Sequence, residues 1–361
     1  MPRKGNNIRK RQDGRWEGRY ISSYGVNGKA IYKSIYGSTY ADVKREKSKA
    51  ENSLTAEKAN SSNKTIEGVI KDFLKKKKHT VKESSFSRYT CICENHIIPY
   101  FKNMKLHKLN NEIINDFMRY KIEKNKLSSK TVKDIVCLLV QIIKGHIHFK
   151  IDIEKPRDRQ KDISVFTHEE YDRLKEFIST GMNNKKLGIM IVMLTGIRLG
   201  EICALKWENV NLEKGIISIN RTIQRVKVTT PTEKSKTKIV IDTPKSEASI
   251  RTIPIPSILQ AKLREFKSYD SSYILTNTSK YIEPRGYQKI FKSYLKSCCI
   301  QDNNFHTLRH TFATMSVAKG MDIKTLSILI GHTDVSFTMK RYVHPDMEYQ
   351  KTQIEKLAIG F

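Results

Sequence analysis

The chain has 361 residues, 38% of them hydrophobic, and 67 lysines and arginines against 37 aspartates and glutamates give a formal net charge of +30 at pH 7. The hydrophobic content excludes a wholly disordered chain, and the charge favours a polyanionic partner such as nucleic acid. There is no apolar run long enough to cross a membrane and no apolar signal segment after the basic start, so we expect a cytoplasmic protein that binds no membrane.

The first predicted unit, residues 1–58, is a small sheet followed by a helix. Aromatic residues and glycines alternate with polar residues from Gly14 to Tyr24 and again from Ala30 to Tyr36, which indicates two or three short strands joined by turns. A helix rich in lysine and arginine is expected from Ser38 to Leu54. A small sheet with aromatic and basic side chains can enter a DNA groove. The alternative is that Trp16 and the tyrosines only form a core.

The second predicted unit, residues 64–149, is all helical. A polar stretch at 52–64 is interpreted as a linker before it, and a charged stretch at 150–162 as a linker after it. Hydrophobic residues recur at helical spacing from residue 66 onward. Further helices are expected near 84–97, 110–122 and 129–147. The last of these carries a wide apolar stripe formed by Val132, Ile135, Val136, Leu139, Ile142, Ile143 and Ile147.

The third predicted unit spans residues 165–361. Thr167 and Glu170 have the spacing of a helix-capping box, which predicts a helix through Ile178. Further elements follow in chain order: helices near 185–195 and 198–206, strands at 216–226, 238–241 and 249–255, and helices from 257 to the end. The three units together predict a multidomain α+β protein, mainly α with small β-sheets.

The cysteines do not suggest a metal site. They stand at positions 91, 93, 137, 203, 298 and 299, without the paired C-x-x-C spacing of zinc ligands. We therefore expect free thiols and no structural metal. The sequence also lacks a Walker loop and a carboxylate cluster, so no nucleotide, metal or other cofactor is expected.

Five short stretches of the third unit carry reactive or phosphate-binding side chains. They are Thr195-Gly196-Ile197-Arg198-Leu199-Gly200-Glu201, Thr243-Pro244-Lys245-Ser246, His306-Thr307-Leu308-Arg309-His310, Gly331-His332 and Arg341-Tyr342-Val343-His344. Cutting DNA without a metal needs a nucleophile, cations that stabilise the growing charge on the phosphate, and an acid for the leaving oxygen. Arg198 and Arg309 suit the second task, because a guanidinium keeps its charge and can hold two phosphate oxygens. Tyr342 is the candidate nucleophile, provided that a base or positive charge activates its phenol.

In this order and spacing, the stretches resemble the signature of the tyrosine recombinases, also called the phage integrase family. The resemblance is strong over residues 167–345, which implies a catalytic domain at 165–361. The helical unit is similar, more weakly, to the family's SAM-like core-binding domain, here 64–149. Residues 1–58 are similar to the arm-type DNA-binding domains of integrases from conjugative transposons and phages.

The resemblance also implies roles for single residues. Arg198 and Arg309 would clamp the two non-bridging phosphate oxygens. His306 is the candidate base, and His332 would donate to a phosphate oxygen. Lys245, expected at a turn between two strands, would be the general acid for the 5′ oxygen.

One further residue and several alternatives complete the expected site. Glu201 stands one helical turn after Arg198, so it is expected to orient that arginine rather than to transfer a proton. The acid could instead be a lysine of the same basic stretch: Lys234, Lys236 or Lys238. Two rival tyrosines do not follow a Gly-His pair at suitable spacing: Tyr294 and Tyr349. Two histidines are interpreted as structural: His310 and His344.

The reaction implied by the resemblance is strand exchange through a 3′-phosphotyrosyl enzyme and a free 5′ hydroxyl, without metal or ATP. Four protomers would assemble on double-stranded DNA that carries core and arm sites, with an excisionase and a host DNA-bending protein as accessory partners. The expected function is a site-specific recombinase that integrates and excises a mobile genetic element. The alternatives are a Xer-like resolvase and a catalytically silent DNA-binding protein on the same fold. A type IB topoisomerase shares the chemistry, but the sequence lacks an extra clamp-like domain.

Overall fold

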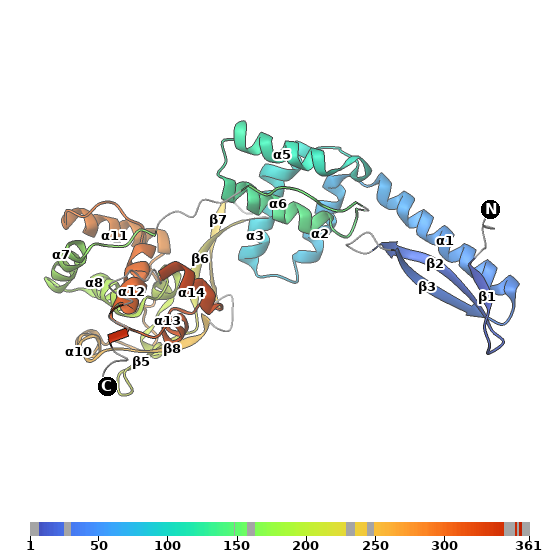
Figure 1. Ribbon diagram of the computed structural model, residues 1–361. Helices are drawn as coiled ribbons and strands as arrows, with labels where there is room; N and C mark the ends of the chain where they lie inside the picture. Colours follow the sequence, from blue (N-terminus) through green and yellow to red (C-terminus); the bar gives the residue numbers. More distant parts are fainter. Residues whose placement is uncertain are drawn as a thin grey trace. The chain divides into compact units, whose positions relative to one another are not determined.

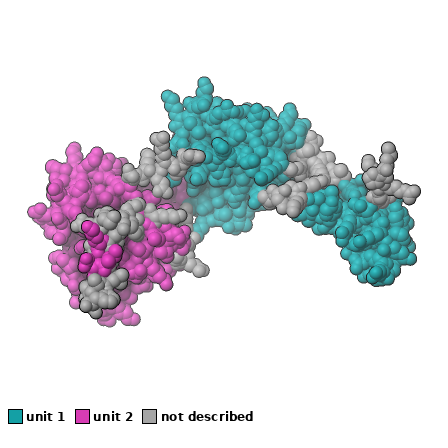
Figure 2. Space-filling view, viewed as in Figure 1, with its two compact units in different colours: residues 1–160, 229–231 teal, residues 161–228, 232–361 magenta. Residues whose placement is uncertain are grey.

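The computed structural model describes residues 7–24, 30–147, 149–156, 163–228, 235–243, 249–342, 351 and 354–355. Over these residues the protein is mainly helical with small antiparallel sheets, which confirms the predicted α+β class (Figure 1). The chain divides into two compact units, residues 1–160 with 229–231 and residues 161–228 with 232–361 (Figure 2). None of the described helices is both long and apolar enough to cross a membrane.

The first unit begins with a three-stranded antiparallel sheet in the order β1 (Ile8–Lys10), β2 (Trp16–Tyr24), β3 (Ala30–Gly37). Helix α1 (Tyr40–Asn63) packs against one face of this sheet (Figure 1). The approach is close: a Cβ atom on Gly18 would lie 2.6 Å from the side chain of Val43.

The length of α1 corrects one expectation. The linker predicted at 52–64 is wrong, because the helix continues to Asn63. The stretch contains alanine, glutamate, lysine and leucine among its serines and asparagines, and these four residue types have high helix propensity. Polar composition alone therefore did not distinguish a solvated helix from a linker.

The rest of the first unit is a helical bundle. Its elements are α2 (Ile66–Lys77), α3 (Glu83–Ile92), a π-turn η1 (Cys93–Ile97), α4 (Ile98–Phe101), a 3₁₀ turn η2 (Leu106–Lys108), α5 (Asn111–Glu123) and α6 (Ser129–Ile143). Side chains of Thr65, Asn110 and Ser128 cap the starts of α2, α5 and α6. The apolar stripe predicted for α6 is buried from Val132 to Ile143. The π-turn ends two residues before Pro99, which lacks the N–H that a regular helix would use there.

The second unit is helical around two small sheets. Its helices are α7 (His168–Ser179), α8 (Asn184–Thr195), α9 (Leu199–Ala204), η3 (Trp207–Asn209), α10 (Ser257–Phe266), α11 (Pro284–Ser297), α12 (His306–Ala318), α13 (Ile323–Ile330) and α14 (Val335–Tyr342). The capping box of Thr167 and Glu170 forms as predicted. A core centred on Trp207, Tyr287 and Phe291 supports the helices from inside.

The sheets of the second unit differ from the expected ones. The stretch 216–226 is not one strand, because β5 (Ile216–Ile219) pairs with β4 (Val210–Asn211) and β8 (Arg251–Pro254), whereas β6 (Thr222–Lys227) pairs with β7 (Thr237–Asp242). β-branched residues occur in both β5 and β6, so the amino-acid composition does not show where the chain leaves one sheet and enters the other. The residues between β7 and β8 therefore connect two sheets. Lys245, expected at a turn between two strands, lies outside the described residues.

Candidate active site

The candidate site lies where five helices of the second unit, α8, α9, α12, α13 and α14, begin or end. Helices α12, α13 and α14 pack against one another, and α12 also packs against α8 (Figure 1). Gly196 ends α8 with a φ of 63°, and this left-handed turn places Arg198 at the start of α9. A Cβ atom on Gly196 would lie 2.4 Å from the Phe312 ring of α12, so the turn requires glycine.

Glu201 is a buried carboxylate between two arginines. Its Oε2 accepts from the backbone N–H of Arg198 and its Oε1 from Arg198 Nη1, both at 2.9 Å. Arg251, at the start of β8, donates to both oxygens, with Nη2 at 2.9 Å from Oε2. Burial would raise the pKa of Glu201, but hydrogen bonding and charge from Arg251, with the charge of Arg198, lower it to about 2. Glu201 is thus ionised and lies where it can orient Arg198.

Three arginines bind the carbonyl end of α13. Arg251 Nε donates to Leu329 O at 2.6 Å, Arg309 Nη2 to Ile330 O at 2.5 Å and Arg198 Nη2 to Gly331 O at 2.8 Å. These are the orphan carbonyls of a helix end, where positive charge is also favoured by the helix dipole. Arg309 Nη1 donates to Gly196 O at 2.8 Å as well, which ties the α8–α9 turn to the same place. The network fixes the three arginines relative to His332, the residue after Gly331.

The site has a large excess of positive charge. Arg309 is 2% exposed, whereas the Arg198 side chain is one-third exposed and faces solvent. Burial and the charge of Arg198 lower the pKa of Arg309, but a guanidinium keeps its proton at neutral pH. With Arg251 and Arg341 nearby and Glu201 as the balancing carboxylate, an anion such as a phosphate is the ligand that this field favours.

Two predicted histidines flank these arginines. His306 is the first residue of α12 and is exposed at the surface, yet partial desolvation by the surrounding protein, together with the charges of Arg309 and Arg198, lowers its pKa to about 4. His332 Nδ1 lies 2.8 Å from Thr338 Oγ1, and burial together with the same charges lowers the pKa of His332 to about 3. Both imidazoles are therefore neutral at physiological pH.

Tyr342 is the last residue of α14 and comes from the same chain as the arginines. Its ring is 5% exposed and packs against Ala313, Val317, Leu326 and Ile330. It stacks on the His332 ring at 6.5 Å between centroids, and its hydroxyl lies 2.7 Å from His310 Nδ1. Burial raises the pKa of Tyr342, while Arg309 and Arg341 oppose that rise. The phenol is therefore protonated at rest and needs an acceptor before it can act as a nucleophile.

The structure brings six of the predicted site residues together and says nothing of the seventh. Those six are Arg198, Glu201, His306, Arg309, His332 and Tyr342. Lys245 lies outside the described residues, as do Lys234, His344 and Tyr349. The rival Tyr294 packs against Phe177 with ring centroids 5.4 Å apart and is partly buried against the main core.

Two residues of the cluster were missed from the sequence. Arg251 was read as part of a strand, although its inward position in the alternation of β8 is a place where an arginine is buried only with a partner. His310 was interpreted as structural, yet it is the hydrogen-bond partner of the candidate nucleophile. It directly follows Arg309 in the sequence, and no sequence pattern indicates that it would contact Tyr342.

Metal binding has no support in the described part of the chain. No group of three or more His, Cys, Asp or Glu side chains there is placed to hold an ion. The six cysteines, all of them within the described ranges, form no disulfide.

The low pKa values of the imidazoles predict a pH-dependent stability. Burial first, then neighbouring charges, lower the pKa of His310 to about 4 and of His332 to about 3, against about 6.5 in an unfolded chain. Below about pH 6.5 the unfolded chain thus binds more protons than the folded one, so the free energy of unfolding should fall as the pH falls toward these values.

Trp207 provides the measurement, because it is fully buried in the second unit and Trp16 is the only other tryptophan. Denaturant titrations in a Trp16→Phe background should show a loss of stability between about pH 7 and about pH 5. His332→Gln removes one of the titrating groups and should lose less over that interval. An equal loss in both proteins would contradict the assignment of His332.

Comparisons with known proteins identify the family to which the chain is similar. A sequence profile described as Phage integrase family matches residues 164–349, and one described as Phage integrase, N-terminal SAM-like domain matches residues 65–123. The chain is 27% identical to a protein named Tyrosine recombinase XerC-like from Caldanaerobacter subterraneus, over 92% of each chain. It is 25% identical to the ICEBs1 integrase of Bacillus subtilis, over 76% of this chain and 78% of the relative.

Solved structures share the fold at low sequence identity. The Tn1549 transposon integrase in complex with transposon right end DNA superposes with a TM-score of 0.65 at 17% identity, over 82% of this chain and all of that one. The lambda integrase tetramer bound to a Holliday junction gives a TM-score of 0.56 at 16% identity, over 96% of this chain and 99% of that one.

Proposed function

The chain belongs to the phage integrase family, and we propose that it is a site-specific DNA recombinase that integrates and excises a mobile genetic element through a 3′-phosphotyrosyl intermediate. The observation that carries the proposal is the position of Tyr342 in the same cluster as Arg198 and Arg309, next to His332. A nucleophile, two permanent cations and neutral imidazoles therefore lie within one small region, which is what metal-free phosphoryl transfer needs.

In the proposed reaction, Tyr342 attacks the scissile phosphate while Arg198 and Arg309 stabilise its growing negative charge. Glu201 positions Arg198, and His332 donates to a phosphate oxygen. His306, exposed at the start of α12, lies where it can contact the phosphate. Lys245 is proposed as the acid that protonates the leaving 5′ oxygen.

A nicked duplex of the element's attachment site tests the function directly. When the strand is cut close to the nick, the short 5′-hydroxyl fragment diffuses away, so the covalent protein–DNA adduct accumulates. A protein that only binds DNA would give no adduct. A Xer-like resolvase would also give one, but it would act on paired chromosomal sites rather than on the ends of an element.

The assembly is proposed by comparison. A lambda integrase tetramer has been seen on a Holliday junction, and we infer that four copies of this chain meet on two duplexes in the same way. An excisionase and a host DNA-bending protein are proposed partners that would set the direction of the reaction.

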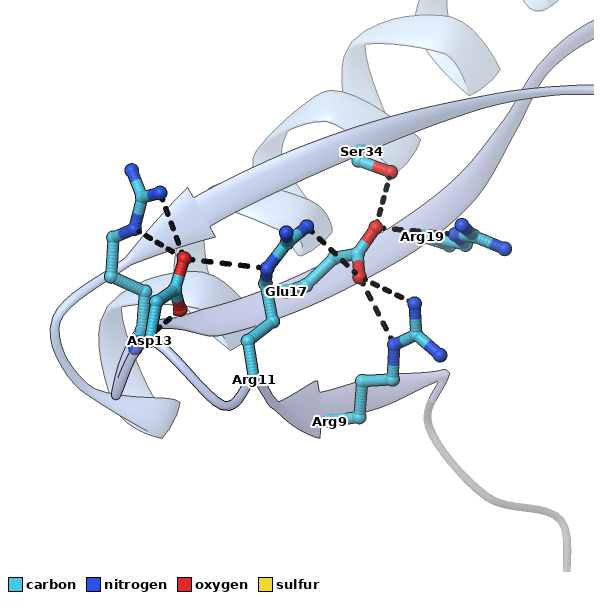
Figure 3. Close-up of polar contacts among 7 residues, drawn as sticks. Arg9, Arg11, Asp13, Glu17, Arg19 and Ser34 are labelled. Carbon is cyan, nitrogen blue, oxygen red and sulfur yellow. Dashed lines mark hydrogen bonds and ion pairs between the residues drawn. The ribbon is translucent and has the colours of Figure 1, made fainter.

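The N-terminal sheet is proposed to bind arm-type DNA sites. Its face opposite α1 carries Arg9, Arg19, Tyr32 and Tyr36, with both tyrosine side chains about half exposed. Glu17 lies among them at 2% exposure (Figure 3). A sheet face of this kind fits the major groove, where arginine reads guanine.

Glu17 holds the arginines of this face in fixed orientations. Arg9 donates to its Oε2 through Nε and Nη2, at 3.0 and 2.9 Å, and Arg19 Nε donates to Oε1 at 3.2 Å (Figure 3). Hydrogen bonds from Ser34, Arg9 and Arg19 lower the pKa of Glu17 to about 2. Because Arg19 uses only Nε, both of its terminal nitrogens stay available for a two-point contact with a base.

We therefore expect Arg19→Ala to weaken binding to long attachment DNA by about tenfold or more, since a two-point base contact contributes ~1–3 kcal/mol. Core-site cleavage on a short duplex should not change. Arg45→Ala on α1 is the matched control, because that exposed arginine lies on the helix rather than on the open face of the sheet. Gel-shift titrations measure the affinity of both variants for long attachment DNA. Equal affinities of the Arg19→Ala and Arg45→Ala variants would contradict the arm-binding assignment.

A further inference from the structure

The hydroxyl of Tyr342 forms a hydrogen bond with a histidine, His310, that has no role in the proposed reaction. His310 Nδ1 lies 2.7 Å from Tyr342 Oη, and the two rings are tilted at 45° with centroids 5.8 Å apart. His310 is in α12, directly after Arg309, and Tyr342 ends α14. The packing of these two helices thus joins an imidazole to the phenol that must lose its proton.

The other surroundings of the phenol offer no comparable acceptor among the described residues. Ala313, Val317, Leu326 and Ile330 are apolar. Arg309 and Arg341 carry protons that they do not release, so they can only donate. The His332 ring lies parallel to the tyrosine ring, and its Nδ1 is bonded to Thr338 instead.

His310 is also in the protonation state that accepting requires. Burial is the main cause that lowers its pKa to about 4, and the charges of His306, Arg341 and Arg309 add to the effect. The groups that face it are His306 and Arg309 from α12 and Arg341 and Tyr342 from α14. With its proton on Nε2, a neutral imidazole presents an unprotonated Nδ1, which accepts the phenol's hydrogen bond.

We propose that His310 is the proton acceptor of Tyr342 in strand cleavage and returns the proton in strand rejoining. This inference rests on the proposed recombinase function and moves the role of base from His306 to His310. His306 lies one helical turn earlier, with its ring edge-on to His310 at 4.7 Å and its side chain exposed toward solvent. His306 is therefore better positioned to contact the phosphate than to accept the proton of the buried phenol.

The step balances in protons and bonds. A bond forms between Tyr342 Oη and phosphorus while the bond from phosphorus to O5′ breaks. The phenol proton passes to His310, which becomes an imidazolium, and Lys245, as the proposed acid, gives a proton to O5′. In rejoining, the attacking 5′ hydroxyl gives its proton to Lys245, and His310 returns its proton to the departing phenol oxygen.

The test is the single-turnover rate of adduct formation on a nicked attachment-site duplex. His310→Ala should slow this rate by on the order of 10²–10⁴-fold, the usual contribution of a positioned base. Imidazole added to the buffer should restore part of the rate, with a pH dependence that follows the free base of imidazole. A variant that fails only through loss of packing would not respond to imidazole in this way. His168→Ala, an exposed histidine of α7, is the control that should keep the wild-type rate.

A substrate with sulfur in place of the bridging 5′ oxygen distinguishes the role of the base from that of the acid. Because a thiolate leaves without protonation, this substrate should rescue Lys245→Ala and leave His310→Ala slow. His310→Gln, which keeps a polar side chain, serves in the same assays if the alanine variant does not fold. Adduct formation by the folded His310 variants at the wild-type rate or faster would overturn the inference and make the contact a resting-state lock. In that event, the absence of an adduct with the Tyr342→Phe variant would still support the proposed function.

Discussion

Tyr342→Phe should form no covalent adduct with nicked attachment-site DNA and should still bind that DNA. The substitution removes one oxygen atom and leaves the ring in its apolar pocket between α12, α13 and α14. Removing a covalent nucleophile costs on the order of a millionfold in rate, so the product should fall below detection. Denaturing gel electrophoresis of the reaction mixture measures the adduct.

Tyr294→Phe is the matched control for that experiment. Tyr294 packs against Phe177 at the edge of the main core, so loss of its hydroxyl should leave the adduct unchanged. An adduct that persists in Tyr342→Phe and disappears in Tyr294→Phe would show that the nucleophile has been misassigned.

Substitution of either clamp arginine should abolish most cleavage while DNA binding persists. Arg198→Ala removes a partly exposed cation from the place where the phosphate charge develops, and the loss of one such donor costs about 3–4 kcal/mol, or roughly 10²–10³-fold in rate. Its partner Glu201 retains Arg251, so the buried carboxylate stays paired. Single-turnover cleavage and gel-shift affinity, measured on the same duplex, separate the two effects.

For Arg309 the lysine variant is the better test. Arg309 is 2% exposed and donates to Gly196 O and Ile330 O through two different nitrogens. Lysine keeps the charge, but it cannot reproduce two planar donors and a phosphate contact together. We expect Arg309→Lys to fold, bind DNA and cleave at least a hundredfold more slowly. Wild-type cleavage by this variant would mean that charge alone suffices and that the planar clamp is not needed.

The chemistry of the site was largely predictable from the sequence because its residues stand in short, ordered motifs. Arg198 with Glu201, His306 with Arg309, and Tyr342 are separated along the chain, yet each belongs to a short motif that the sequence shows by itself. Two of the helix ends are also marked locally, because Gly196 ends α8 shortly before Arg198 and Gly331 ends α13 directly before His332. The helix period also predicted the buried stripe of α6. These signals are local, and local signals survive in a single sequence.

The missed features depend on contacts between distant segments. The bond from His310 to Tyr342 joins residues 32 positions apart, and that from Arg251 to Glu201 joins residues 50 apart. No periodicity reports which buried polar groups will meet across such separations. The split of 216–226 into two sheets has the same cause, because partner strands β7 and β8 decide where β6 and β5 belong.

The most direct measurement of the central claim is the chemical identity of the covalent link. The adduct trapped on nicked attachment-site DNA is digested with nuclease and protease, and the remaining nucleotide-bearing peptide is sequenced by mass spectrometry. We predict a single modified residue, Tyr342, joined to the 3′ phosphate of the cut strand, with a free 5′ hydroxyl on the released fragment. A link through Tyr294, Tyr349 or any other residue, or to a 5′ phosphate, would contradict the account.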